Sequence, residues 1–264
     1  MKFRITALAE NTVFQRYLRA EHGLSLLVEV FKHDENTENS AGTESLIFDT
    51  GASPIFDENA HKMGISLKGA SMIVLSHRHW DHTGGLLRAL KYTRKVLAHP
   101  KVAEFVGDEI HGIPFSAGEL EEAGVEWNFL SNFVQIADGV YFTGEVPRKL
   151  MPQFGDFPDD ASLVLDLGDT LGLVCGCCHA GVVNVAGYVE GIFKKKLSCI
   201  TGGLHLFRLS DAEIEETGER LKKYLSDDFT IHLSHCSGTR ALSIWTRIFG
   251  GKVRWLSTGM SLIL

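Results

Sequence analysis

Four side chains that can bind metal ions stand within six positions of one short segment, residues 72–87, whose sequence is MIVLSHRHWDHTGGLL. These side chains are His77, His79, Asp81 and His82. The apolar, partly β-branched residues 72–75 predict a buried strand, and the polar residues begin where that strand ends. The segment therefore constrains the chain to a fold that presents imidazoles and a carboxylate at the end of a core strand.

The spacing of these residues suits one or two metal ions. On a strand end, side chains at positions i and i+2 leave the same side of the backbone, so His77 and His79 can converge on one ion. Asp81 and His82 precede the turn signal Thr83-Gly84-Gly85 and can hold a second ion. Neutral imidazoles with one carboxylate suit zinc, and also iron or manganese. A surface cluster of histidines is the alternative, but four ligands in this order rarely arise by chance.

Two later strand ends carry histidines in turns of small residues. The strand predicted over residues 171–175 runs into Gly-Cys-Cys-His-Ala-Gly, and the strand over residues 229–233 runs into Ser-His-Cys-Ser-Gly. We expect His179 and His235 to be metal ligands, because glycine turns let the backbone approach an ion closely. For His179, helix capping or pocket lining is the alternative. Cys177 is either a thiolate ligand or a small buried core residue.

Three further residues could line the same site. Asp49 directly follows a predicted strand, and a buried carboxylate needs a partner, so it could orient a ligand histidine. Its alternative is a turn or helix N-cap near Pro54. His205, in the turn Gly-Gly-Leu-His, could bind metal or substrate. His99, at a strand end before Pro100, could face the site or cap the loop.

Length and composition indicate one α/β domain over residues 1–264, with no linker-like stretch. The formal net charge of −7 argues against a nucleic-acid groove as the main surface. We find no signal-peptide core in residues 1–20 and no apolar run that could span a bilayer, so we expect a cytoplasmic protein without a membrane partner. The five cysteines gather near histidines, which favours reduced thiols over a disulfide framework.

Other patterns predict a strand over residues 24–31, a polar hairpin loop over 33–45 and a helix over 56–63. An amphipathic helix is expected over residues 211–225, with Ser210 as N-cap and Glu213 at the capping-box position. The aromatic-rich residues 101–158 are either an insertion that covers a substrate or core aromatics under long loops.

The segment over residues 72–87 resembles the signature of the metallo-β-lactamase superfamily. Further segments resemble the branch typified by the dihydropterin ribofuranosylaminobenzene phosphate synthase: Glu21-His22-Gly23-Leu24-Ser25, Phe48-Asp49-Thr50-Gly51, Gly176–Gly181, Gly202–Leu206 and His235–Gly238. The resemblance implies a four-layer αββα sandwich with a metal site, usually dinuclear, at one edge of two packed sheets. One departure is that Gly176-Cys177 and then His179 stand where a bridging aspartate is usual. The resemblance therefore allows either one or two bound ions.

The resemblance implies a metal-dependent enzyme, hydrolase-like or a pterin-transferring synthase, that acts on a phosphorylated or cyclic small molecule. Asp81 would position the attacking water. One alternative is a redox-active protein with two metal ions, which predicts native iron and a redox partner. Another is a non-catalytic binding protein of the same fold, which predicts that metal ligands have been lost. Edge strands could support a homodimer.

Overall fold

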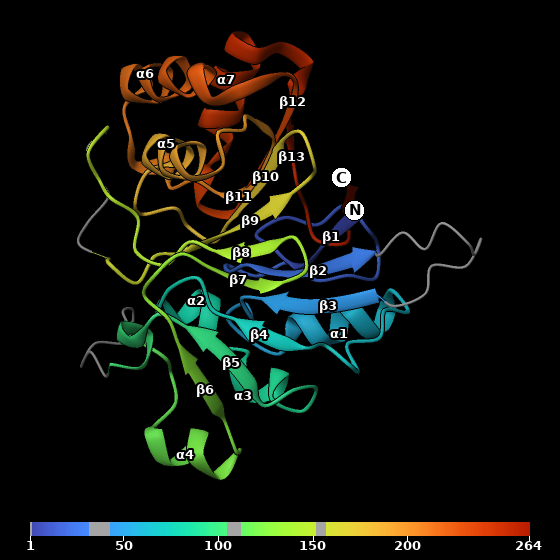
Figure 1. Cartoon of the computed structure of the whole chain (residues 1–264). Coiled ribbons are helices and arrows are strands. Elements are labelled where there is room, and N and C mark those ends of the chain that lie inside the picture. The colour runs from blue at the N-terminus through green and yellow to red at the C-terminus, as the bar shows by residue number, and fades with distance from the viewer. Residues whose placement is uncertain (1, 32–42, 105–111, 152–156) are drawn as a thin grey trace, which may run out of the picture. The chain divides into compact units, whose positions relative to one another are not determined.

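Two mixed β-sheets of seven strands each organise the computed structural model, which describes residues 2–31, 43–104, 112–151 and 157–264 (Figure 1). Each sheet belongs to one of two compact units. The first unit comprises Met1–Ser131 and Ser257–Leu264, and the second comprises Asn132–Leu256. Mixed sheets with helices confirm the predicted α/β class.

In the first unit, the strand order places three predicted site residues at one sheet edge. The order is β14-β1-β2-β3-β4-β5-β6, and β3 to β6 run parallel. Because parallel strands end at the same edge, Asp49, His77 and His99 follow β3, β4 and β5 there. The strands are β1 (Lys2–Ala9), β2 (Ser25–Phe31), β3 (Thr43–Phe48), β4 (Met72–Val74), β5 (Lys95–Ala98), β6 (Glu126–Phe129) and β14 (Ser261–Ile263). The helices are α1 (Ile55–Lys62), α2 (Trp80–Thr83), α3 (Leu86–Ala89) and α4 (Ala117–Glu122).

The second unit repeats this arrangement with the order β13-β12-β11-β10-β9-β8-β7. Strands β10 to β13 run parallel, so the turns that follow β10, β11 and β12 share an edge. The strands are β7 (Val134–Ala137), β8 (Val140–Phe142), β9 (Ser162–Asp166), β10 (Leu171–Cys175), β11 (Leu197–Gly203), β12 (Leu225–Ser234) and β13 (Val253–Trp255). The helices α5 (Val182–Phe193), α6 (Asp211–Leu221) and α7 (Thr239–Phe249) contribute to one hydrophobic core with these strands, and α6 contacts both α5 and α7 (Figure 1).

The observed elements differ from the sequence predictions mainly at their ends. Helix α2 already includes Asp81 and His82, ahead of the glycines at which we placed the turn, and the helix from Leu86 ends at Ala89. Strand β12 begins four residues before the predicted strand. Most of the predicted hairpin loop over residues 33–45 lies outside the described residues.

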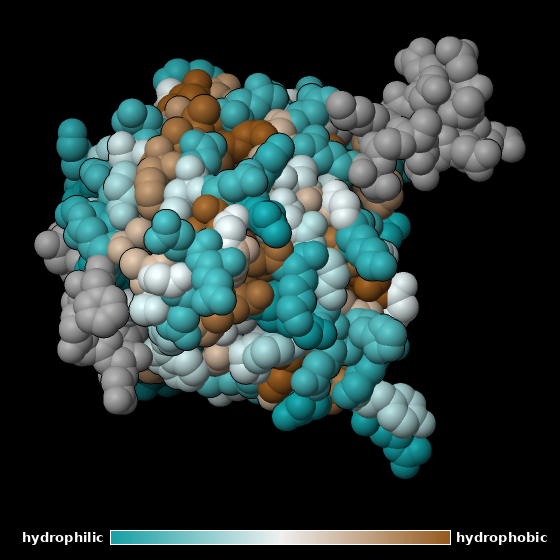
Figure 2. All heavy atoms as spheres, turned by 90° about the horizontal axis from the view of Figure 1, so that it is seen from below, coloured by the Kyte–Doolittle hydropathy of each residue, from teal (hydrophilic) through white to brown (hydrophobic). Residues whose placement is uncertain are grey.

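The surface is mixed in character. Figure 2 shows one face on which hydrophilic side chains predominate and hydrophobic ones form smaller groups. Among the described residues, no helix is both long and apolar enough to cross a membrane.

Helix α6 begins with the predicted capping box, and this allows a test of its stability. The Glu213 N–H donates to Ser210 Oγ, and Glu213 Oε2 accepts from the Ser210 N–H at 2.8 Å. We expect Ser210→Ala to lower the free energy of unfolding by about 1 kcal/mol, because it removes the cap. Urea unfolding measures this loss. Thr246→Ala, in the exposed interior of α7, is the control and should be nearly neutral; an equal loss there would contradict the capping argument.

Candidate metal centre

Three predicted ligand histidines lie together in the first unit, at the end of β4 and in α2. His77 Nε2 lies 2.9 Å from His79 Nδ1, and the rings of His77 and His82 are 4.3 Å apart between centroids. His77 and His82 are fully buried. Buried imidazoles in such close contact are a donor set that fits a transition-metal ion.

Asp49 is a buried carboxylate that accepts three hydrogen bonds at the edge of this cluster. Its Oδ2 lies 2.7 Å from His82 Nδ1 and accepts the Ser76 hydroxyl at 2.7 Å, while Oδ1 accepts the Ser76 N–H at 2.7 Å. The Ser76 hydroxyl also lies 2.9 Å from His77 Nδ1. Because a histidine that donates Nδ1–H to a carboxylate presents Nε2 to a metal, this contact suits the predicted orienting role of Asp49. Helix α1 has Pro54 as its N-cap, so Asp49 does not cap it.

Asp81 is buried and lies beside a histidine that we had not singled out. Its Oδ2 is 3.3 Å from Nε2 of His22, whose side chain is exposed. The backbone around Asp81 is fixed by its neighbours, since the Leu24 N–H donates to the Asp81 carbonyl at 3.1 Å and the Thr50 N–H donates to the His82 carbonyl at 2.7 Å. Asp81 is therefore held in place by main-chain contacts with two other segments.

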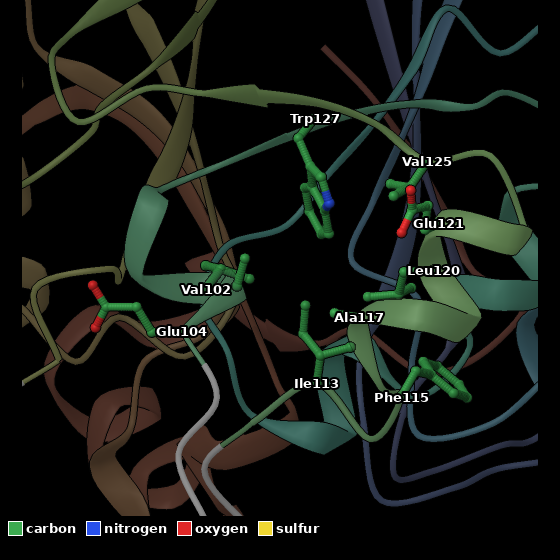
Figure 3. A pocket seen from close by; sticks show the side chains of 10 residues that line it. Val102, Glu104, Ile113, Phe115, Ala117, Leu120, Glu121, Val125 and Trp127 are labelled. Atoms are coloured by element: carbon green, nitrogen blue, oxygen red, sulfur yellow. The ribbon is translucent and has the colours of Figure 1, made fainter.

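His99 serves the loop that follows β5. Its Nδ1 accepts the Lys101 N–H at 3.2 Å and so caps the short 3-10 helix Pro100–Ala103, which is the loop-capping alternative of the sequence prediction. Beyond this turn, a mostly apolar cavity of about 260 Å³ lies within the first unit. The side chains of Val102, Leu120 and Trp127 point into it (Figure 3). No predicted metal ligand is among the described residues that line it.

The second unit gathers its own imidazoles and thiols at the carboxyl edge of β10, β11 and β12. The rings of His179 and His205 are 4.3 Å apart between centroids. One ligand atom each from Cys177, His205 and Cys236 lies within 4.8 Å of the other two. His235 is buried and has φ of +49°, a left-handed conformation that is rare outside glycine.

The cysteines of this unit differ in their acidity. Burial acts to raise the pKa of Cys236, but hydrogen bonding to Cys177 and the charges of His235 and His205 hold it well below its ordinary value. Burial raises the pKa of Cys199 to about 12. Cys175 and Cys199 are buried and lie in β10 and β11. The surroundings therefore favour the thiolate form at Cys236 more than at Cys199.

Asp160 predicts a pH dependence of stability. Burial raises its pKa to about 7, although the N–H groups of Ala180 and His179 hydrogen-bond to it and act in the opposite direction. Its carboxyl group is thus protonated in the folded protein at a pH where the unfolded chain has lost the proton. Stability should therefore fall as pH rises from about 4 to 7, by up to about 4 kcal/mol.

Urea unfolding at several pH values measures this effect, with Asp160→Asn as the matched variant. Its amide oxygen can still accept the Ala180 N–H, but it does not titrate, so its stability should change less with pH than that of the wild type. Parallel curves for the two proteins would contradict the assignment to Asp160.

Sequence reasoning missed Ser76, His22, Asp160 and the thiol of Cys236. Ser76 and Cys236 each adjoin a predicted ligand, and that adjacency was the available signal. His22 lies in the quoted segment Glu21-His22-Gly23, but its contact with Asp81 joins the segment before β2 to helix α2.

Comparisons with known proteins identify the family of this chain. Residues 39–183 match the sequence model of the metallo-beta-lactamase superfamily. An uncharacterized protein of Methanocaldococcus jannaschii is 26% identical over 253 residues, covering 90% of this chain and 92% of that protein. The 7,8-dihydropterin-6-methyl-4-(beta-D-ribofuranosyl)-aminobenzene-5'-phosphate synthase of the same organism is 28% identical over 273 residues, covering 91% and 89%.

Solved structures give the same result for the fold. A metal-dependent hydrolase of the beta-lactamase superfamily has a TM-score of 0.81 at 26% identity, with 98% of each chain covered. A diphosphatase from the PhnP family shares the fold with a TM-score of 0.58 at 16% identity, covering 100% of this chain and 98% of that one. The family model spans more than half of the sequence, and it confirms the resemblance drawn from the histidine motif. The chain belongs to the metallo-β-lactamase superfamily.

Proposed function

We propose that the protein is a metal-dependent enzyme that acts on a phosphorylated or cyclic small molecule. The observation that carries this proposal is the cluster formed by the buried His77 and His82 with the half-buried His79, and the hydrogen bond between Asp49 and His82. An imidazole cluster that is buried and already oriented by a carboxylate is costly to keep unless it binds an ion. Superfamily membership and a relative described as a metal-dependent hydrolase support the same conclusion.

The proposed ligand set is the one that the sequence predicts. It comprises His77, His79, Asp81, His82, His179 and His235, and it would hold one or two divalent ions, with zinc preferred over iron or manganese. Bound ions would supply Lewis-acid activation of water and of a substrate carbonyl or phosphoryl oxygen.

The protein's own groups have distinct tasks in this proposal. Asp49 fixes the tautomer of His82, and Asp81 positions the nucleophile and receives its proton. His205, Cys177 and His99 would contact substrate or support the ligands.

The reaction is either hydrolysis or transfer of a pterin group to a second substrate. Both need the same activation of an electrophile, and they differ in whether water or another molecule attacks. The relative described as a synthase favours testing the transfer, whereas the relative described as a hydrolase favours testing water as the nucleophile.

The first experiment measures metal content and activity together. Protein from cells supplied with zinc, iron and manganese, purified without chelator, should contain at least one equivalent of transition metal. It should hydrolyse a phosphodiester, lactone or thioester, or join a dihydropterin diphosphate to a ribofuranosylaminobenzene 5′-phosphate. The double variant His77→Ala/His79→Ala should lose metal and activity. His61→Ala, an exposed histidine of α1, is the control and should keep both.

A wild-type protein that contains no transition metal would overturn the proposal. Native iron with a bound redox partner and no hydrolysis or transfer would favour the redox alternative. Metal binding without any reaction on this substrate panel would favour the non-catalytic binding protein.

A further inference from the structure

We propose that Cys177, His205 and Cys236 form a thiolate-rich site that binds a zinc-type divalent cation. All three residues belong to the second unit, and none is among the six ligands proposed above. The site adjoins those ligands in the chain, because Cys236 follows His235 and Cys177 lies two residues before His179. It assigns Cys236 a role that the sequence motif alone did not indicate.

The distances among the donor atoms suit such a cation. One atom from each residue, the sulfur of each cysteine and a ring nitrogen of His205, lies within 4.8 Å of the other two. In a tetrahedral zinc site with bonds of about 2.0–2.3 Å, the ligand atoms are about 3.3–3.8 Å apart. A contraction of about 1 Å is enough to close the site around an ion, and side-chain rotation alone can supply it.

The surroundings of the two sulfurs favour a bound cation. Cys177 is 3% exposed and Cys236 is 7% exposed. The backbone N–H of His205 donates a hydrogen bond to Cys236 Sγ at 3.3 Å, which holds this sulfur beside the turn that carries the His205 imidazole. A divalent cation bound by both sulfurs would balance the negative charge that cysteine ligands carry once they are coordinated.

The backbone around the cluster is adapted to leave space beside the sulfur. A Cβ atom on Gly203 would lie 2.7 Å from Cys236 Sγ and 2.3 Å from the Gly176 carbonyl oxygen. His205 has φ of +50°, which costs energy for a residue other than glycine and is kept where the surrounding structure or a function requires it. The turns after three adjacent parallel strands thus bring the two sulfurs and the imidazole together.

Sulfur and imidazole ligands select the kind of ion. Two thiolates with one imidazole suit zinc and related soft cations and disfavour magnesium and calcium, which prefer oxygen ligands. Three protein ligands leave one tetrahedral position for a further ligand.

Cobalt(II) is a suitable probe because its bonds to thiolate give charge-transfer absorption in the near ultraviolet, and oxygen or nitrogen ligands do not. The reduced, metal-free full-length protein would be titrated with cobalt(II). We expect a charge-transfer band whose intensity corresponds to about two cobalt–thiolate bonds per site. Cys236→Ser should reduce this intensity by about half. Cys199→Ala removes a buried thiol of β11 outside the cluster and should leave the absorption unchanged. His77→Ala/His79→Ala should also keep it, which separates this site from the centre of the proposed function.

Alkylation of the wild-type thiols gives a second measurement that needs no variant. Zinc should slow the modification of Cys177 and Cys236 about tenfold or more, while other thiols react at an unchanged rate. Three results would overturn the proposal: no charge-transfer absorption in the reduced wild type, absorption that Cys177→Ser removes but Cys236→Ser leaves intact, or no protection of Cys236 by zinc. A disulfide between Cys177 and Cys236 that forms in air, with no cation bound after reduction, would assign the pair to redox chemistry instead.

Discussion

Replacing Asp49 with alanine is expected to lower the free energy of unfolding of the metal-free protein by about 3–5 kcal/mol. The carboxylate is fully buried and accepts the Ser76 N–H, the Ser76 hydroxyl and His82 Nδ1–H, each at 2.7 Å. Alanine would leave all three donors without their acceptor in a space that is closed to water. Metal affinity should fall about 10- to 100-fold as well, because His82 loses the group that fixes its orientation.

Urea unfolding with a chelator present measures the loss of stability, and zinc competition measures the affinity. Asp49→Asn retains one acceptor oxygen, but its amide NH₂ group faces one of the donor groups that the carboxylate accepted. Compared with Asp49→Ala, it should lower the metal affinity almost as strongly and the stability less. Asp166→Ala is the control, since that partly exposed carboxylate pairs with Lys195 at 2.7 Å and should cost no more than about 1 kcal/mol. A loss for Asp49→Ala as small as that of the control would show that the buried hydrogen bonds do not hold the cluster.

The second large effect is expected at Gly202, where β11 approaches β10. Gly202 has φ of +114°, and a Cβ atom there would lie 1.9 Å from the Cys175 carbonyl oxygen. Cys175 is its register partner in the parallel pair, so the clash is with backbone and cannot be relieved by a rotamer change. We expect Gly202→Ala to cost about 4 kcal/mol, from conformational strain together with displacement of the strand.

Gly168→Ala separates these two contributions. Gly168 has φ of +92°, but nothing lies within 4 Å of a Cβ atom built on it. This variant should therefore show the conformational cost alone, about 1–2 kcal/mol. Thermal or urea unfolding of both variants gives the steric cost as the difference. Equal losses would mean that the strand pair relaxes around the new methyl group.

The sequence predicts the features of this protein that depend on local chemistry. The strand before His77 and the capping box at Ser210 follow from residues only a few positions apart. The Asp49–Ser76 hydrogen bonds do not, because they join residues 27 positions apart whose distance depends on how β3 and β4 align. The same holds for Cys236, whose approach to His205 depends on the parallel alignment of β11 with β12.

Helix ends were also hard to predict. His235 and His205 have left-handed φ values of +49° and +50°. This conformation belongs to tight turns that distant segments pack against, so the residue type alone did not indicate it. The short helix α2, which the sequence did not predict, has a similar origin, since the Asp81 and His82 carbonyl groups accept the N–H groups of Leu24 and Thr50.

The hydrogen bonds of Asp49 have a consequence for how the protein responds to losing its metal. In small zinc domains the ion assembles its ligands, so a chelator unfolds the chain. Here Ser76 lies 2.9 Å from His77 Nδ1 and Asp49 lies 2.7 Å from His82 Nδ1, so two of the imidazoles are oriented by residues that follow strands of the sheet. Removing and restoring the ion should therefore be a reversible exchange on a folded scaffold, and occupancy would follow the free metal concentration without a refolding step.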